Sequence, residues 1–351
     1  MALRTGGKLL DKGGYGCIFV PPLVCKDTRP SGKDDMNTID KLMKANDAKE
    51  EFTIGERVRR LPLWKNYFIV ADMMCVPAPA NQQKDKDIGK CKVIDTKSLE
   101  GYRLLRMRFG GQPLDLYRMN IYAHKFGDFA KHIIEAGALL SLFGIVHRDL
   151  HFGNILVDSE NVPRIIDYNL SIDVQRPVVR GNLLHTFSVN YIQEPPDYCL
   201  INGLIQGMDG YDTIEKIVNE RQILGKLVSV LGIGKAEMRE QLVDFYGKSK
   251  LIQNNDIEGW FRTYWDKIDS WSIGVILTKI LSGLMLWPQF RKGELPTLQQ
   301  TLIPVLREMC NFDPSRRINC VVALAKLDPQ NFIVKKFGRE WTSVQGDHLH
   351  V

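Results

Sequence analysis

The chain has 351 residues, of which 44% are hydrophobic and 25% charged, as in ordinary globular proteins of one large domain or two lobes. Its net charge of +6 comes from scattered basic residues without a Lys/Arg block, so we expect no specific nucleic-acid partner. No run reaches the roughly 18 apolar residues that cross a bilayer, and the first ten residues lack the apolar core of a signal peptide. We expect a soluble protein without membrane contact.

The seven cysteines lie far apart, at positions 17, 25, 75, 91, 199, 310 and 320. An odd count without regular spacing predicts reduced thiols in a cytosol-like compartment, and hence a cytoplasmic location. Cys75 and Cys91 flank a polar loop and could share a metal ion. Because no CxxC pair accompanies them, unpaired structural cysteines are the expectation.

The first hundred residues are mainly β-structure with one helix. Strands are expected at four places, with a glycine turn inside the first: 8–20, 37–43, 67–76 and 101–109. Residues 47–61 have apolar residues at helical spacing, with Asp47 at the N-cap position.

After residue 111 the pattern is mainly helical. A helix at 128–144 is expected to end at Gly144. Helical periodicity continues in four later stretches: 211–246, 257–285, 297–310 and 318–327. A sheet-rich first part and a helical second part indicate two lobes with a cleft between them, an N-lobe of residues 1–110 and a C-lobe of residues 111–351.

The stretch IVHRDLHFGNILV, at 145–157, sets polar residues tightly between two apolar runs. Short strands at NILV and RIID are expected to bring Asp149, Asn154 and Asp167 near one another. Two carboxylates and a carboxamide are hard oxygen ligands, which suit Mg²⁺ that bridges phosphates. A metal-bound phosphate needs little else from a protein except positioning and charge.

These residues resemble the signature of the protein-kinase superfamily, which runs His-Arg-Asp, an Asn five residues later and an Asp-Phe-Gly turn. Here it reads HRD at 147–149, Asn154 and DYN at 167–169, with the family's usual 13 residues from Asn154 to Asp167. The resemblance implies an α+β, bilobal protein-kinase-like fold with a small β-rich N-lobe and a larger helical C-lobe. It also implies that Asp149 orients or deprotonates the attacking hydroxyl, and that Asn154 and Asp167 hold Mg²⁺ beside ATP.

The segment KLLDKGGYGCIF, at 8–19, resembles the glycine-rich loop of the same family. Glycines let backbone N–H groups approach phosphate oxygens. The resemblance implies ATP-binding positions at Asp11, which replaces the first glycine, and at Gly13, Gly14, Tyr15, Gly16 and Ile18. Alone, a glycine-rich hairpin is more often just a turn.

Two lysines compete for the α and β phosphates of the nucleotide. Lys26 comes ten residues after Gly16, too few for two strands and a turn, whereas Lys41 comes 25 residues after it and directly precedes the helix. Lys41 is therefore favoured. The glutamate that orients the lysine is expected at Glu51, with Glu50 and Glu56 as alternatives, although a solvated helix face explains any of the three.

The segment RLLRMRFGGQPL resembles the family's hinge between the lobes. The resemblance places Met107 at the back of the adenine pocket and the backbone of Arg108 and Gly110 at the adenine edge. An ordinary core methionine explains Met107 about equally well.

Two later segments also resemble the family. DSWSIG, at 269–274, begins a buried helix whose Asp269 braces the catalytic loop through backbone N–H groups. NFDPSRRI, at 311–318, supplies Arg317, which is expected to pair with Asp197 of EPPDY. Both segments are usually missing from small-molecule kinases, so they favour a protein substrate that offers a Ser or Thr hydroxyl.

The chain departs from the family pattern at His151, where serine/threonine kinases carry a lysine. A histidine is partly charged near neutral pH and could donate a hydrogen bond to the transferring phosphate. DLHFGN looks like the DLHPGN of aminoglycoside kinases, so a small-molecule phosphotransferase is an alternative. Asp11, His151 and Asn169 together also allow a pseudokinase that acts as a scaffold or virion component.

Asp269 follows Asp197 by 72 residues, where ordinary kinases have about a dozen. The helical insertion, at about 198–262, resembles divergent serine/threonine kinases of large eukaryotic DNA viruses. It could bind a partner protein. A viral protein of this kind is expected in the host cytoplasm or in the particle.

Overall fold

The computed structural model describes residues 7–26, 37–83, 86–95, 98–177 and 180–338. The chain divides into two compact units. The sheet unit comprises residues 1–112 and 164–170, and the helical unit comprises residues 113–163 and 171–351. The first holds an antiparallel sheet with a helix and the second is largely helical, which confirms the expected α+β, two-lobed fold class. The domain limits expected at residue 110 stay a prediction.

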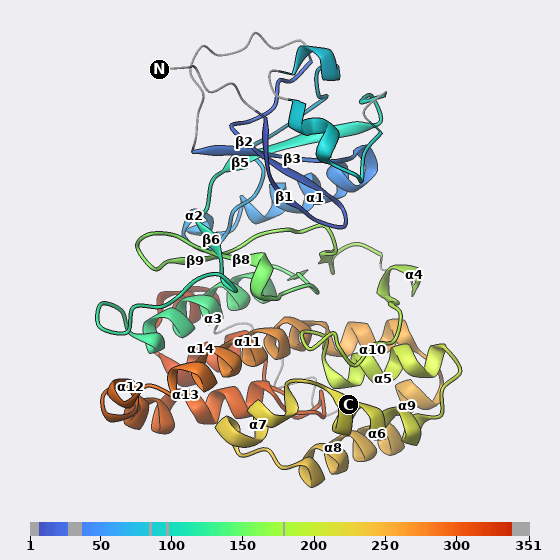
Figure 1. Ribbon diagram of the computed structural model, residues 1–351. Coiled ribbons are helices and arrows are strands. Elements are labelled where there is room, and N and C mark those ends of the chain that lie inside the picture. The colour runs from blue at the N-terminus through green and yellow to red at the C-terminus, as the bar shows by residue number, and fades with distance from the viewer. Residues whose placement is uncertain (1–6, 27–36, 84–85, 96–97, 178–179, 339–351) are drawn as a thin grey trace. The chain divides into compact units, whose positions relative to one another are not determined.

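A five-stranded antiparallel sheet forms the core of the sheet unit (Figure 1). In spatial order its strands are β1 (Lys8–Lys12), β2 (Gly16–Val20), β3 (Thr38–Lys44), β5 (Tyr102–Arg108) and β4 (Met73–Cys75). Because side chains alternate between the faces of a strand, β3 directs Ile39, Lys41 and Met43 to one face and Asp40 and Leu42 to the other.

The strand expected at 67–76 is largely wrong. Its start belongs to the short helix α2 (Trp64–Tyr67), and β4 covers the last part alone. Residues 68–71 are buried without joining the sheet, apart from an isolated bridge between Phe68 and Ile165. The apolar run therefore reflects burial in the core, which a strand and a buried loop share.

Helix α1 (Ala45–Val58) packs on β3 and β5. Its buried side includes Ala48, Ile54 and Val58, which recur at helical spacing. The helix begins two residues earlier than expected, so the N-cap is Lys44 and Asp47 lies in the first turn. An acidic side chain there still interacts favourably with the helix dipole.

Two disulfides cross-link the sheet unit, Cys17–Cys91 and Cys25–Cys75. For these four cysteines they overturn the expectation of unpaired reduced thiols, and they also exclude a metal shared by Cys75 and Cys91, which the sequence had left as the less favoured reading. The partners are 74 and 50 residues apart in sequence, and the folded sheet brings them together, so spacing alone could not reveal them. Nearby lie the 3₁₀ turns η1 (Ala80–Gln82) and η2 (Lys86–Lys90). The cysteine pattern no longer argues for a cytosol-like compartment.

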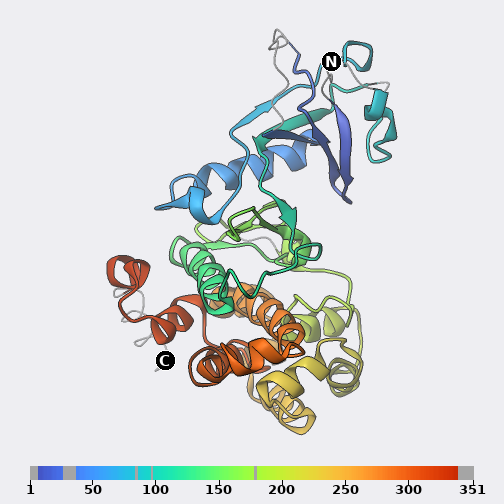
Figure 2. The same ribbon diagram turned by 60° about the vertical axis from the view of Figure 1, so that its left-hand side comes forward.

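The helical unit contains twelve α-helices among the described residues (Figures 1 and 2). They are α3 (Phe126–Leu142), α4 (Arg180–Leu183), α5 (Pro196–Ile205), α6 (Gly210–Glu220), α7 (Leu224–Leu231), α8 (Lys235–Lys248), α9 (Lys250–Gln253), α10 (Ile257–Tyr264), α11 (Ile268–Leu284), α12 (Pro288–Lys292), α13 (Leu295–Met309) and α14 (Cys320–Leu327). Shorter elements are η3 (Phe152–Asn154), η4 (Trp265–Lys267) and the π-helix η5 (Val334–Gly338).

Short strands accompany these helices. They are β6 (Gln112–Pro113), β7 (Ile145–Val146), β8 (Ile155–Val157), β9 (Pro163–Ile165) and β10 (Ile172–Asp173). Strands β7 and β10 pair antiparallel on either side of the HRD segment. Strands β6 and β9 contain points where the chain passes from one unit to the other.

Helix α11 is buried along most of its length and packs against α3, α7 and α13. Gly137 of α3 permits this packing, because a Cβ atom there would lie 2.5 Å from Cδ1 of Ile273 and 2.7 Å from Sγ of Cys320. Gly144, with φ +69°, follows the end of α3, which confirms the expected helix end.

The long insertion is helical, as expected, and runs from α5 to α10. Several of its aromatic side chains belong to a buried cluster in which the rings of Tyr198 and Trp260 lie 4.9 Å apart. The insertion is thus packed into the core of the helical unit. No helix in the described part of the chain is long and apolar enough to cross a membrane.

Candidate functional site

The turn between β1 and β2 presents the glycine-rich segment. The N–H of Gly13 donates to the carbonyl of Gly16 at 2.8 Å, and Tyr15 at the tip is 48% exposed. A Cβ atom on Gly14 would meet no atom within 4 Å. A Cβ atom on Gly16 would lie 2.4 Å from the carbonyl oxygen of Leu42, so the approach of β2 to β3 requires glycine there. Packing explains Gly16, whereas the backbone at Gly14 is open to a ligand.

The register of the sheet places several candidate residues on one face. Ile18 lies directly opposite Lys41, and Ile39 lies opposite Met107. Because directly opposite residues share a face, Ile18, Lys41 and Met107 line the same side of the sheet. Asp11 is exposed on β1, and its carboxylate accepts a hydrogen bond from the next N–H along the chain.

Lys41 is the centre of a buried charge cluster. Its Nζ lies 2.7 Å from Oε2 of Glu51 and 2.8 Å from Oδ1 of Asp167, and its side chain is 8% exposed. Asp167 belongs to the stretch of chain that returns to the sheet unit, and its φ of +66° is uncommon for a residue other than glycine. Such backbone strain persists only where surrounding contacts enforce it.

The charges of this cluster depend on one another. Burial alone would lower the pKa of Lys41, but the carboxylates of Glu51 and Asp167 outweigh it, so that pKa is raised above its ordinary value. Burial raises the pKa of Glu51, and the Lys41 ammonium counteracts this. Lys41 therefore stays charged throughout the physiological pH range.

The competing residues lie at the surface. Lys26 is 3.6 Å from Glu100, with side chains that are 48% and 83% exposed. Glu50 is exposed on α1, and exposed Glu56 lies 3.7 Å from Arg59. Among the lysines and glutamates weighed from the sequence, the structure brings together Lys41 and Glu51.

The hinge-like segment follows β5. Met107 is buried, and the guanidinium of Arg108 donates to the carbonyls of Lys65 at 2.5 Å and Phe68 at 3.3 Å. Gly110 is buried. These contacts fix the end of β5 within the sheet unit.

In the helical unit, the first turn of α11 holds the HRD segment through hydrogen bonds. The carboxylate of Asp269 accepts hydrogen bonds from the N–H groups of His147 at 2.6 Å and Arg148 at 2.9 Å, which confirms the expected brace. Burial raises the pKa of Asp269, and these hydrogen bonds oppose the shift. Arg148 has φ +69°, a strained conformation that the brace helps to maintain.

The guanidinium of Arg148 contacts α5 and the segment before it. It donates to the hydroxyl of Tyr198 at 2.8 Å and lies 2.6 Å from Nε2 of His185. Burial and the charge of Arg148 lower the pKa of His185 to about 4, so this imidazole is neutral at pH 7 and accepts the hydrogen bond.

Asp149 and Asn154 lie in contact. Nδ2 of Asn154 donates to the backbone carbonyl of Asp149 at 2.9 Å and to its Oδ2 at 3.3 Å. His151 accepts the N–H of Gly153 on Nδ1, so its proton resides on Nε2, 3.7 Å from Oδ2 of Asp149. The histidine therefore faces the carboxylate, where sequence reasoning had directed it to a phosphate. Asp167 belongs to the other unit, beside Lys41.

The expected ion pair between Arg317 and Asp197 is confirmed at 2.7 Å, with both side chains 1% exposed. Nε1 of Trp260, from the insertion, also donates to Asp197, at 3.2 Å. Aspartate is one methylene shorter than the usual glutamate, yet it reaches the arginine.

Sequence reasoning missed an ion pair on the opposite face of the sheet, between buried Asp40 and half-buried Arg106. Asp40 accepts two hydrogen bonds from Arg106, at 2.9 and 2.8 Å, and the same guanidinium donates to the carbonyl of Leu23 at 2.7 Å. The signal was present in the alternation of β3, which turns Asp40 toward the disulfide-linked side.

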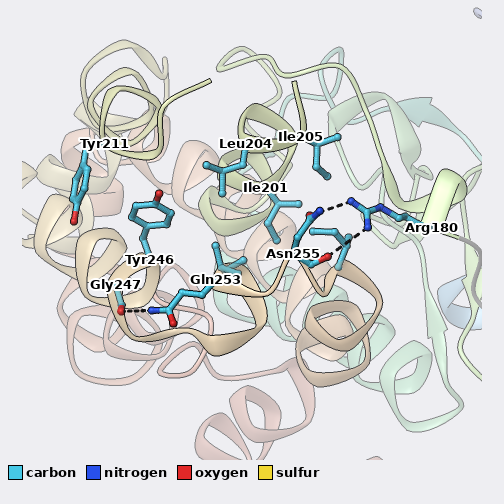
Figure 3. A pocket seen from close by; sticks show the side chains of 11 residues that line it. Arg180, Ile201, Leu204, Ile205, Tyr211, Tyr246, Gly247, Gln253 and Asn255 are labelled. Carbon is cyan, nitrogen blue, oxygen red and sulfur yellow. Dashed lines mark hydrogen bonds between the residues drawn. The ribbon is translucent and has the colours of Figure 1, made fainter. Parts of the chain in front are cut away.

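A cavity of about 640 Å³ lies in the insertion, lined by side chains of α4, α5, α6, α9 and α10 and by residues near the end of α8 (Figure 3). Apolar residues such as Ile201 and Leu204 form part of its wall, and Arg180 donates to the side-chain oxygen of Asn255 at 3.0 Å. Its lining includes none of the candidate catalytic residues.

Within the described residues, no group of three His, Cys, Asp or Glu side chains is arranged to hold a metal ion. The magnesium site that the family resemblance implies uses the carboxylate of Asp167 and the carboxamide of Asn154, so a group of three such side chains is not required for it. Mg²⁺ is commonly held by one or two carboxylates together with substrate phosphates.

Comparison with known proteins gives a partial similarity. The chain is 32% identical over 83 residues to mitogen-activated protein kinase kinase 9 of Arabidopsis thaliana, which covers 23% of this chain and 27% of that protein. The match thus spans about a quarter of the length of that relative. No family model matches the chain. A sheet-bearing first unit and a helical second unit are consistent with a distant kinase-like relationship.

Proposed function

We propose that the protein is an ATP-dependent protein kinase that transfers the γ-phosphoryl group to Ser or Thr hydroxyls of protein substrates. The observation that carries this proposal is the buried Lys41 ammonium, held at once by Glu51 and Asp167. Phosphoryl transfer depends on charges placed at fixed positions around the phosphates. The partial similarity to a MAP kinase kinase points the same way.

The residues of the sheet unit would bind the nucleotide. The glycine-rich turn is open to a ligand at Gly14, so its backbone N–H groups would approach the phosphates. Nζ of Lys41 would contact the α and β phosphates, and Glu51 would keep it oriented. Met107 would lie at the back of the adenine pocket, and the backbone of Arg108 and Gly110 would meet the adenine edge.

Asn154 and Asp167 would hold Mg²⁺, since both offer hard oxygen ligands. When bound, the ion neutralises charge on the β and γ phosphates. The proposal requires these two residues to converge around the nucleotide, and they are 13 residues apart along the chain.

Asp149 would act as the base. Its carboxylate takes the proton of the acceptor hydroxyl as that oxygen forms a bond to the γ phosphorus, and the bond to ADP breaks with its electron pair on ADP. Nδ2 of Asn154 orients the carboxylate through a hydrogen bond at 3.3 Å, and Nε2 of His151 lies 3.7 Å from the same oxygen. The direct contact between His151 and the transferring phosphate stays a prediction.

A transfer assay with radiolabelled ATP tests the proposal. Casein and histone serve as protein acceptors, and sugars and aminoglycosides as small-molecule acceptors. Wild type should label protein, and Asp149→Asn should lower labelling at least 100-fold, whereas the matched control Asp212→Asn, an exposed acid on α6, should not.

Other outcomes separate the alternatives. Labelling of small molecules alone would favour the aminoglycoside-kinase-like activity. Binding of ATP-Mg²⁺, seen as thermal stabilisation, without transfer to any acceptor would favour a pseudokinase scaffold. A partner protein at the insertion, a kinship with viral kinases and a location in the host cytoplasm or the particle stay predictions.

A further inference from the structure

The segment Tyr191–Glu194, just before α5, has an unusual set of hydrogen bonds. Each of its four backbone carbonyls accepts from a buried side chain of another part of the helical unit. The donors are Nη2 of Arg221 to Tyr191 at 2.8 Å and to Glu194 at 2.5 Å, Nε1 of Trp271 to Ile192 at 3.0 Å, and Oγ of Ser272 to Gln193 at 2.7 Å. Because these donors are buried in the core of the helical unit, the segment can open only when that core opens.

Arg221 belongs to the insertion, directly after α6, and it is 2% exposed. Burial lowers the pKa of its guanidinium, whose carbon lies 5.6 Å from the ring centre of Trp271. Two of its nitrogens, Nε and Nη1, find no hydrogen-bond partner among the described residues. Burying a guanidinium in this way costs free energy, so its two contacts to the segment need an explanation beyond stability. One nitrogen of the guanidinium, Nη2, carries two N–H groups and donates to both carbonyls, so it holds the two ends of the segment together.

The fixed backbone directs Gln193 toward the candidate base. Nε2 of Gln193 lies 3.5 Å from Oδ1 of Asp149, at the long end of the hydrogen-bond range, while Asn154 and His151 face Oδ2. Catalytic hydrogen bonds are often long before substrate binds and then tighten. The backbone N–H of Gln193 makes no hydrogen bond with a described residue, which leaves a donor for the carbonyl of an acceptor peptide.

We propose that Gln193 contacts the phosphoryl acceptor beside Asp149, and that Arg221 of the insertion is the positioning residue that holds Gln193 there. This inference rests on the proposed kinase function and assigns the acceptor class as a polypeptide. The carboxamide both donates and accepts, so it can meet Asp149 and the acceptor hydroxyl together. Through Arg221, the insertion thereby takes part in acceptor binding without contacting the acceptor itself.

Steady-state kinetics at varied acceptor and ATP concentrations test the inference. Gln193→Ala should raise KM for the protein acceptor about tenfold, which corresponds to ~1.4 kcal/mol, and leave KM for ATP within about twofold of wild type. Gln300→Ala, an exposed glutamine on α13, is the matched control. Gln193→Glu keeps the length of the side chain but replaces the donating amide with a carboxylate that repels Asp149, so it should raise the acceptor KM at least as much as Gln193→Ala. A purely structural residue would not change the acceptor KM apart from the ATP KM.

Arg221 is tested by Arg221→Lys, which keeps the positive charge but replaces the guanidinium whose Nη2 donates to both carbonyls. It should raise acceptor KM in the same direction and speed hydrogen exchange in residues 191–194. If Arg221→Lys does not fold, the Gln193 variants decide. Unchanged acceptor KM in Gln193→Ala, in an enzyme whose wild type phosphorylates protein, would overturn this inference and leave the proposed function standing. Failure of wild type to label any acceptor would overturn both.

Discussion

At the scale of single residues, the two lysines show what spacing can and cannot decide. Counting from Gly16 favoured Lys41, but the structural reason is its register opposite Ile18 and its contact with Glu51. Sequence reasoning found Asp149, Asn154 and Asp269 because their motif is local. It missed Gln193, because contact with Asp149 depends on how distant side chains hold the intervening backbone.

Replacing Lys41 tests the charge cluster. Lys41→Ala should lower phosphoryl transfer by about 100-fold or more, since it removes a fixed cation from the phosphates, and Lys26→Ala should only reduce it. The assay is autophosphorylation or acceptor labelling, with circular dichroism as a check on folding, because the change also leaves Glu51 and Asp167 facing each other. A larger loss from Lys26→Ala would contradict the assignment and leave the fold unaffected.

At the scale of elements, the hairpin, the central strands and the long helices follow from periodicity. Periodicity failed at 67–76, where a buried loop has the same apolar residues as a strand. It was silent on the disulfides, because a covalent pair between β2 and a loop 74 residues away depends on sheet order. The Asp197–Arg317 pair was predictable, since both residues lie in recognisable segments.

Removal of the Cys17–Cys91 bond should destabilise the sheet unit. The bond closes a loop of 74 residues, so its loss should lower the free energy of unfolding by about 4–5 kcal/mol. Urea unfolding of Cys17→Ser/Cys91→Ser measures the change, and Cys199→Ser, a buried free thiol, is the control. Thiol titration of the unfolded, unreduced protein should find three thiols and, after reduction, all seven. Seven thiols before reduction would refute the pairing.

At the scale of the whole molecule, stability should depend on pH through Glu194. Burial raises the pKa of this carboxyl from 4.5 to about 7, with Arg221 opposing the shift. The native state therefore binds more protons than the unfolded state between these values. Its contribution to stability is fully present below pH 4.5 and is lost as the pH rises through about 7.

Glu194→Gln removes this dependence. Measured from pH 4 to 8, the free energy of unfolding of wild type should fall relative to Glu194→Gln as the pH rises, and the difference should level off above about pH 7. Glu220→Gln, on the exposed side of α6, is the matched control. A constant difference across the range would show that Glu194 titrates as an ordinary carboxyl.

The return of residues 164–170 to the sheet unit makes that unit discontinuous. A gene cut after codon 112 would encode every strand of the five-stranded sheet, yet the fragment would lack the carbonyl of Ile165, which accepts the buried N–H of Ile69 at 3.0 Å. The fragment would also lack Asp167, so of the two carboxylates that contact Lys41 it would keep Glu51. A minimal version of this unit must therefore also contain residues 164–170, joined for instance through a short artificial linker.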